Sequence, residues 1–111
     1  MLEVIKEGKT VAVDFDGTIV TDKFPEIGEP NLELVAWLKQ YRANGGEIIL
    51  WTSRNKDALP KAVDFCTSLG LEFDAINENL KENQIKWQGD TRKVLADYYL
   101  DDKAVEWKST N

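Results

Sequence analysis

Residues 10–18 read TVAVDFDGT, and the rest of the chain builds its fold around this stretch. Residues 10–15 are a short apolar and β-branched run, which predicts a strand that is buried on both faces. Gly17 then allows the chain to turn sharply away from that strand. Upstream, residues 2–8 (LEVIKEG) indicate a further short strand that turns at Gly8.

Downstream of this strand, helical and strand patterns alternate along the chain. Asn31 is a suitable N-cap for a first helix, and Asn44, Gly45 and Gly46 end that helix. The predicted elements are helices at 32–43 and 57–69, strands at 47–52, 72–76 and 95–100, and a weak helix within the polar residues 77–92. Alternation with short connections is typical of a parallel α/β sheet. We therefore expect one domain over residues 1–111, with a three-layer Rossmann-like parallel sheet and flanking helices.

Two segments stand outside this alternation. The stretch from Gly17 to Pro30 is rich in Gly and Pro and too short for a domain, so we expect an irregular flap or small hairpin at about residues 18–30. At the other end, residues 103–111 leave open whether a fifth strand follows.

Composition excludes several classes of chemistry. The chain has 111 residues, 14 Lys and Arg against 20 Asp and Glu, a net charge of -6, one Cys and no His. Without His, Ser-His-Asp and Cys-His nucleophiles and His-ligated zinc sites are excluded, and the single Cys66 excludes an internal disulfide. The acidic balance disfavours nucleic acid as a partner. No apolar run is long enough for a membrane span or a signal peptide, so we expect a cytoplasmic protein.

Polar side chains follow the predicted strands at the point where each strand ends. Asp14 and Asp16 point the same way, because residues two apart on an extended backbone share one side. Right-handed crossovers bring the carboxyl ends of parallel strands to one edge, where open sheets bind ligands. The other residues at this edge are Thr52, Ser53 and Arg54 after the second strand, Asn77 after the third, and Asp101 and Asp102 after the fourth. Lys93, just before the fourth strand, is within reach of the same edge.

Four carboxylates at one edge need a cation. Two carboxylates about 4 Å apart repel by roughly 4 kcal/mol at an effective dielectric constant near 20. A site of oxygen ligands alone suits Mg²⁺. Gly17 would leave backbone N–H groups free for an anion beside it. The residues therefore indicate a site for a divalent cation and an anionic group.

The first of these strand ends also resembles a known signature. Residues 13–19 read VDFDGTI, which is similar to the hhhhDxDGT motif of the haloacid dehalogenase superfamily of phosphohydrolases. The rest of that family's pattern follows in order, as a strand that ends in Thr52 (ILWTSR), then Lys93, then a strand that ends in Asp101 and Asp102 (YYLDD). The resemblance extends to about residue 104 and is nearest to small members without a cap domain.

This resemblance implies a Mg²⁺-dependent phosphatase that works through an aspartyl-phosphate. Asp14 would be the nucleophile that attacks phosphorus. Asp16 would be the general acid and base, with a backbone carbonyl that also binds Mg²⁺. Thr52 would hydrogen-bond a phosphate oxygen, and Lys93 or its neighbour Arg92 would neutralise the nucleophile and the phosphate.

The remaining site residues follow from the same comparison and from their position at the edge. The metal ligands would be Asp14, Asp16, Asp101 and Asp102. The candidate contacts to substrate are Gly17, Thr18, Ser53, Arg54 and Asn77. Arg54 in particular would hold a second anionic group of the substrate.

The spacing leaves no room for the cap domain that members of this superfamily usually carry. Only the flap lies between Thr18 and Asn31, and only a helix, a strand and a polar segment lie between Thr52 and Lys93. An open site of this kind implies a bulky or macromolecular phosphorylated substrate, or a homo-oligomer in which a neighbouring subunit serves as the lid.

Two other functions fit the same residues. One is a regulatory module that binds phosphate and Mg²⁺ without turnover, although the intact aspartates argue against it. The other is a receiver-like phospho-accepting domain, which carries its acceptor Asp on a middle strand. Here the third strand ends in Asn77, which disfavours that reading. Repeated turnover would distinguish an enzyme from both.

Overall fold

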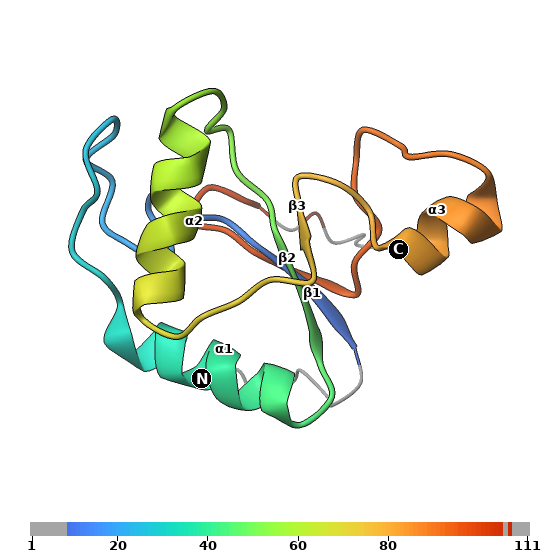
Figure 1. Cartoon of the computed structure of the whole chain (residues 1–111), viewed down its shortest axis with the longest axis horizontal. Helices are drawn as coiled ribbons and strands as arrows, with labels where there is room; N and C mark the ends of the chain where they lie inside the picture. Colours follow the sequence, from blue (N-terminus) through green and yellow to red (C-terminus); the bar gives the residue numbers. More distant parts are fainter. Residues whose placement is uncertain (1–8, 106, 108–111) are drawn as a thin grey trace.

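Within residues 9–105 and 107, which the computed structural model describes, a sheet of four parallel strands is flanked by three helices (Figure 1). In the strand order β3-β2-β1-β4, β2 and β3 follow one another on one side of β1, and β4 lies on the other side of β1. In chain order the elements are β1 (Thr10–Val13), α1 (Leu32–Ala43), β2 (Glu47–Leu50), α2 (Ala58–Ser68), β3 (Ala75–Ile76), α3 (Lys81–Trp87) and β4 (Tyr98–Leu100). The prediction of a Rossmann-like parallel α/β sheet is confirmed.

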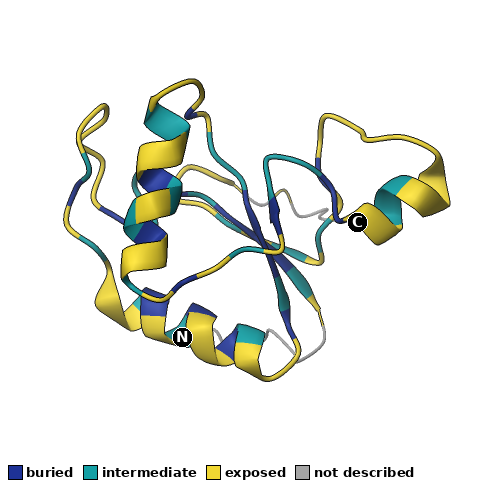
Figure 2. Ribbon diagram, in the orientation of Figure 1, coloured by how far each residue is buried: buried dark blue, intermediate teal, exposed yellow. Residues whose placement is uncertain are grey.

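The two faces of the sheet are covered unequally. On one face α1 and α2 pack over the strands, and the main core lies between them (Figures 1 and 2). The opposite face has a smaller core, to which Leu80 and Val94 contribute from the segment around α3. Helix α3 itself buries no residue. The expected third layer is therefore present but thin.

The sequence predicted the two long helices closely. Asn31 caps α1, since its side-chain Oδ1 accepts the N–H of Leu34 at 3.1 Å. The apolar side of α2 buries Ala62 and Cys66. Burial raises the pKa of the Cys66 thiol to about 12, which fits a residue that packs rather than reacts. Gly70 follows α2 with a φ of 79°, a left-handed conformation that favours glycine.

The strands are shorter than their apolar patterns predicted. The predicted strand 10–15 ends at Val13, because the chain then folds into a turn in which the carbonyl of Phe15 accepts three backbone N–H groups. The predicted strand 47–52 likewise ends at Leu50. An apolar pattern reports burial and not the end of a hydrogen-bonded ladder, so it overestimates strand length here.

Two aspartates explain why β3 and β4 begin later than the predicted strands 72–76 and 95–100. The carboxylate of Asp74 accepts the backbone N–H of Ile48 at 2.7 Å, while the N–H of Asp74 donates to the carbonyl of Ile48 at 2.8 Å. Asp97 makes the same pair of bonds with Thr10, both at 2.8 Å. In each case a side-chain oxygen replaces a backbone carbonyl at the amino end of the sheet.

The expected flap is an irregular excursion with a hairpin-like stem. Val20 and Pro30 form an isolated antiparallel bridge, and the N–H of Thr21 donates to the carbonyl of Glu29 at 2.8 Å. The predicted strand at residues 2–8 lies outside the described residues. So does most of 103–111, of which residues 103–105 and 107 form no strand. Among the described residues, no helix has the length and apolar character that a membrane span requires.

Asp74 provides a test of the strand-start arrangement. Its carboxylate also accepts from Arg42 at 3.0 Å, so Asp74→Ala removes an ion pair and leaves the buried N–H of Ile48 without its acceptor. We expect the free energy of unfolding to fall by about 1–3 kcal/mol, the usual cost of an unsatisfied buried donor. Urea denaturation measures it. Asp64→Ala, at an exposed position of α2, is the control, and an equal change in both variants would contradict this account.

Candidate active site

The strand register brings the chemically important residues to one edge. Val13 of β1 pairs with Leu50 on one side and with Leu100 of β4 on the other. Asp14 and Asp101, which follow these strand ends, therefore lie at the same edge of the sheet. The strand order reverses between β1 and β4, and open α/β sheets bind ligands at such a reversal.

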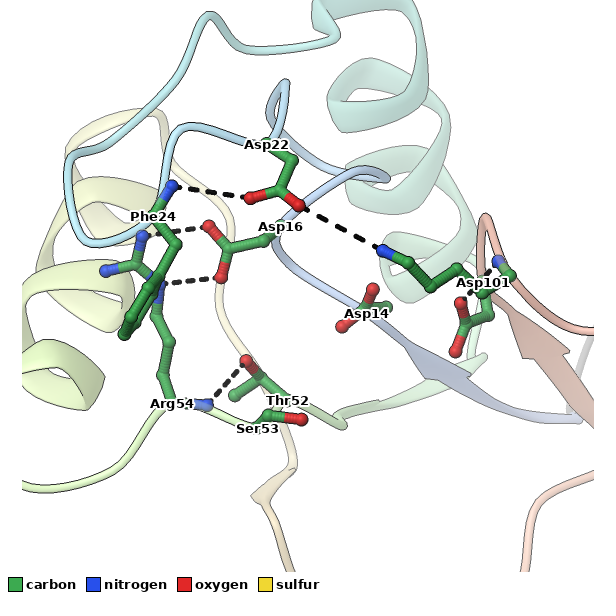
Figure 3. Close-up of a pocket in the computed structure, with 9 residues that line it drawn as sticks. Asp14, Asp16, Asp22, Phe24, Thr52, Ser53, Arg54 and Asp101 are labelled. Carbon is green, nitrogen blue, oxygen red and sulfur yellow. Dashed lines mark hydrogen bonds and ion pairs between the residues drawn. The ribbon is translucent and has the colours of Figure 1, made fainter.

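A cleft of about 400 Å³ opens at this edge, between the strand ends and the flap (Figure 3). Its lining residues are Asp14, Asp16, Asp22, Phe24, Thr52, Ser53, Arg54, Asp101 and Lys103. Asp14, Asp16, Asp101 and the Thr52–Arg54 segment are predicted at this edge by the sequence. Asp22 and Lys103 are not.

Three carboxylates form a cluster at this edge, and two of them line the cleft. Oxygens of Asp14, Asp101 and Asp102 all lie within 4.8 Å of one another. Asp102 does not line the cleft but lies against Gly17, where a Cβ would come within 2.3 Å of Asp102 Oδ2. With a φ of 88°, Gly17 makes the turn and leaves room for Asp102.

This cluster has an electrostatic cost that falls on Asp14. The pKa of Asp14 is raised from 3.8 to about 6, chiefly by burial and then by the neighbouring carboxylates of Asp101, Asp102 and Asp16, against a backbone hydrogen bond from Phe15 that lowers it. A group of carboxylate oxygens at this spacing, with one member reluctant to ionise, fits the ligand chemistry of a hard divalent cation. Of the predicted metal ligands, Asp14, Asp101 and Asp102 form this set.

The carboxylate of Asp16 is engaged elsewhere. Both of its oxygens accept hydrogen bonds from Arg54, from Nε and from Nη2, each at 2.8 Å. The same guanidinium donates to the carbonyls of Glu26, Pro25 and Ala58. Arginine has five N–H donors, so all of them are satisfied within the protein. The prediction that Arg54 holds a second anionic group of the substrate is therefore wrong for this structure.

Of three other predicted substrate contacts, Gly17 and Asn77 have structural roles, and Thr18 does not reach the cleft. The N–H of Gly17 donates to the carbonyl of Val20 at 2.8 Å, so it is not free for an anion. Asn77 does not line the cleft. Its Oδ1 accepts the N–H of Thr52 at 2.8 Å and so fixes that residue. Thr18 also stays out of the cleft, and its buried hydroxyl has no hydrogen-bond partner among the described residues.

The structure puts Lys93 in a different hollow. Its Nζ lies 5.4 Å from the centre of the Tyr99 ring, and neither it nor Arg92 lines the cleft. Buried Asn79 holds this segment, since its Oδ1 accepts the N–H of Leu95 at 2.6 Å. The predicted position of Lys93 at the cleft is therefore wrong for this structure.

A different lysine takes that position. Lys103 lines the cleft, with Nζ 3.6 Å from Asp102 Oδ2 and 4.0 Å from Asp22 Oδ2. Its place in the sequence directly after Asp101-Asp102 was the signal that could have identified it. Asp22 carries no comparable signal, because only the folding of the flap brings it to the edge.

The raised pKa of Asp14 predicts an unusual stability change. Between the ordinary value of 3.8 and about 6 the folded state binds more protons than the unfolded state, so stability falls as pH rises through this window. We expect Asp14→Asn to raise the thermal midpoint at pH 8 in the presence of a chelator, and to raise it less at pH 4.5. Circular dichroism melts measure both. A lower midpoint for the variant at pH 8 would contradict the conclusion that ionised Asp14 destabilises the folded state.

Comparison with known proteins gives one informative result. A scan against models of protein families finds no match, and a search of curated proteins finds none either. Among solved structures, a conserved protein from Bacteroides thetaiotaomicron superposes with a TM-score of 0.79. The two chains are 40% identical, and the match covers 89% of this chain and 79% of that one. By this similarity, the chain belongs to the same family as the conserved Bacteroides thetaiotaomicron protein.

Proposed function

We propose that this protein is a Mg²⁺-dependent phosphatase of the haloacid dehalogenase type, without a cap domain, that hydrolyses phosphate monoesters. The observation that carries the proposal is the position of Asp14. It lies in an open cleft and within 4.8 Å of Asp101 and Asp102, next to the hydroxyl residues Thr52 and Ser53. The resemblance of residues 13–19 to the superfamily motif supports the same assignment.

In the first step Asp14 is the nucleophile. A carboxylate oxygen of Asp14 forms a bond to phosphorus, and the bond from phosphorus to the leaving oxygen breaks. Asp16 gives a proton to that leaving oxygen, which requires its carboxyl group to carry this proton while its oxygens accept the bonds from Arg54. The hydroxyl of Thr52 lines the cleft and donates to a phosphate oxygen, and Lys103 at the rim contributes a positive charge.

In the second step water regenerates the enzyme. Asp16, now deprotonated, accepts a proton from water as the water oxygen attacks phosphorus. The bond between phosphorus and Asp14 breaks, which releases orthophosphate. Both steps require Asp16 to exchange a proton with a group in the cleft, and its side chain does line the cleft.

The cation would be held by Asp14, Asp101 and Asp102. Bound there, Mg²⁺ would neutralise these carboxylates and the charge of the phosphate, which otherwise repel each other. Carboxylates are its usual protein ligands. Without this positive charge, burial and the neighbouring carboxylates raise the pKa of Asp14.

The proposed substrate is a phosphate monoester, and the cleft is compatible with many members of that class. The open edge supports a substrate that extends beyond the cleft, or closure by a neighbouring subunit. The net charge of -6 continues to disfavour nucleic acid.

Hydrolysis of p-nitrophenyl phosphate tests the function. We expect repeated turnover with Mg²⁺, loss of activity with a chelator, and a fall in kcat of at least a thousandfold, on the order found for lost nucleophiles, in Asp14→Asn. Asp64→Asn, on the exposed side of α2, is the matched control.

Other outcomes would favour the alternatives. A single phosphorylation of Asp14 without turnover would indicate a receiver-like domain. Binding of phosphate and Mg²⁺ without any hydrolysis would indicate a regulatory module. Activity that survives both the chelator and Asp14→Asn would refute the mechanism.

The two lysines can be separated by substitution. Lys103 lines the cleft and Lys93 lies over Tyr99, so Lys103→Met should lower kcat/KM by roughly tenfold or more and Lys93→Met much less. Steady-state kinetics with p-nitrophenyl phosphate measures both. A greater loss in Lys93→Met would instead support the role that the resemblance implies, and would require the segment around Lys93 to approach the cleft with substrate bound.

A further inference from the structure

The guanidinium of Arg54 joins three parts of the molecule that meet at the cleft. Arg54 is 2% exposed although it is charged. It holds Asp16 at the end of β1 through two bonds of 2.8 Å. It holds the flap through the carbonyls of Glu26 at 2.9 Å and Pro25 at 3.3 Å, and the start of α2 through the carbonyl of Ala58 at 3.3 Å.

Two aromatic rings enclose this guanidinium. The centres of the Phe15 and Phe24 rings each lie 5.0 Å from Arg54 Cζ. Phe15 belongs to the buried core, whereas Phe24 belongs to the flap, is 58% exposed and lines the cleft (Figure 3). The flap thus contacts the guanidinium both through backbone carbonyls and through a ring.

These contacts couple the position of the flap to the orientation of the Asp16 carboxyl group. Arg54 has no donor to spare, so a flap that moves away leaves at least two of its N–H groups without acceptors. A guanidinium that shifts to recover them cannot keep both bonds to Asp16. The position of the flap therefore affects the orientation of the Asp16 carboxyl group.

We propose that Arg54 is a positioning residue that couples the flap to Asp16, so that the closed flap aligns Asp16 for proton transfer to the leaving group. This inference rests on the proposed phosphatase function. It adds to that function a residue that contacts neither the phosphorus nor the metal ligands Asp14, Asp101 and Asp102.

The geometry specifies arginine at this position. A planar guanidinium bonds both oxygens of one carboxylate and still has three N–H groups for the carbonyls, and it stacks between rings. Lysine keeps the charge but has three donors in a compact ammonium group. Arg54→Lys should therefore preserve the ion pair in part and lose the alignment. Arg54→Met should lose both while filling the same space.

The first experiment measures how the rate depends on the leaving group. The nitrophenolate ion departs without a proton, whereas an alkoxide needs one, so a fault in Asp16 alignment slows alkyl phosphates most. For Arg54→Lys we expect kcat with glycerol 2-phosphate to fall about a hundredfold, within the range of general acid catalysis, and kcat with p-nitrophenyl phosphate to fall far less. An equal loss with both substrates would overturn the positioning role.

A double substitution tests whether Arg54 acts through Asp16. In the Asp16→Asn background, Arg54→Lys should cause little further loss with glycerol 2-phosphate, because the group it aligns is already absent. Arg42→Lys is the matched control, since Arg42 also bonds a carboxylate, that of Asp74, but away from the cleft. Losses that multiply in the double variant would overturn the proposal.

The second experiment follows the flap without any assay of activity. Lys23 is exposed in the flap and offers a site for trypsin. We expect cleavage after Lys23 to be several times faster in Arg54→Met and Arg54→Lys than in the wild type, and unchanged in Arg42→Lys. Unchanged cleavage in folded Arg54 variants would overturn the coupling. If the wild type has no phosphatase activity, the positioning role fails with the proposed function, while cleavage still shows whether Arg54 holds the flap.

Discussion

The register of the parallel strands is the constraint on which the rest of the structure depends. Val13, Leu50 and Leu100 stand side by side in the ladder, so the chain leaves three strands at one level. Asp14 and Asp101 meet there because of this alignment and not because of any contact between them. A parallel sheet whose order reverses at β1 thereby gathers charged groups at one edge, where helices do not cover them.

The carboxylates at this edge are handled in two different ways. The charge of Asp16 is balanced by buried Arg54, which also ties it to the flap. Within the described part of the chain, Asp14, Asp101 and Asp102 have no internal partner of equal strength, since Lys103 lies 3.6 Å from Asp102 and is itself mostly exposed. One aspartate of the DxD pair is thus bound within the protein, while the other faces the cleft with a raised pKa.

Local patterns in the sequence were sufficient for most of the fold and for the outline of the site. The apolar spacing and the Asn31 cap specify α1, and the strand ends specify where Asp14, Thr52 and Asp101 collect. The details that failed depend on contacts between distant segments. Arg54 lies 38 positions from Asp16 and its partners come from the flap and α2, so no local pattern reveals that its donors are taken.

The aspartates before β3 and β4 make the two ends of the sheet differ in how their negative charges affect folding. The net charge of the chain, -6, does not show this difference. At the amino end, the charges of Asp74 and Asp97 are held by backbone N–H groups of neighbouring strands and contribute to folding. At the carboxyl end, burial and the neighbouring carboxylates raise the pKa of Asp14, so its ionisation opposes folding. When related sequences are compared, replacement of an acidic residue by a neutral one therefore has opposite meanings at the two ends. At the amino end it signals a weakened scaffold, and at position 14 a more stable fold that lacks the carboxylate facing the cleft.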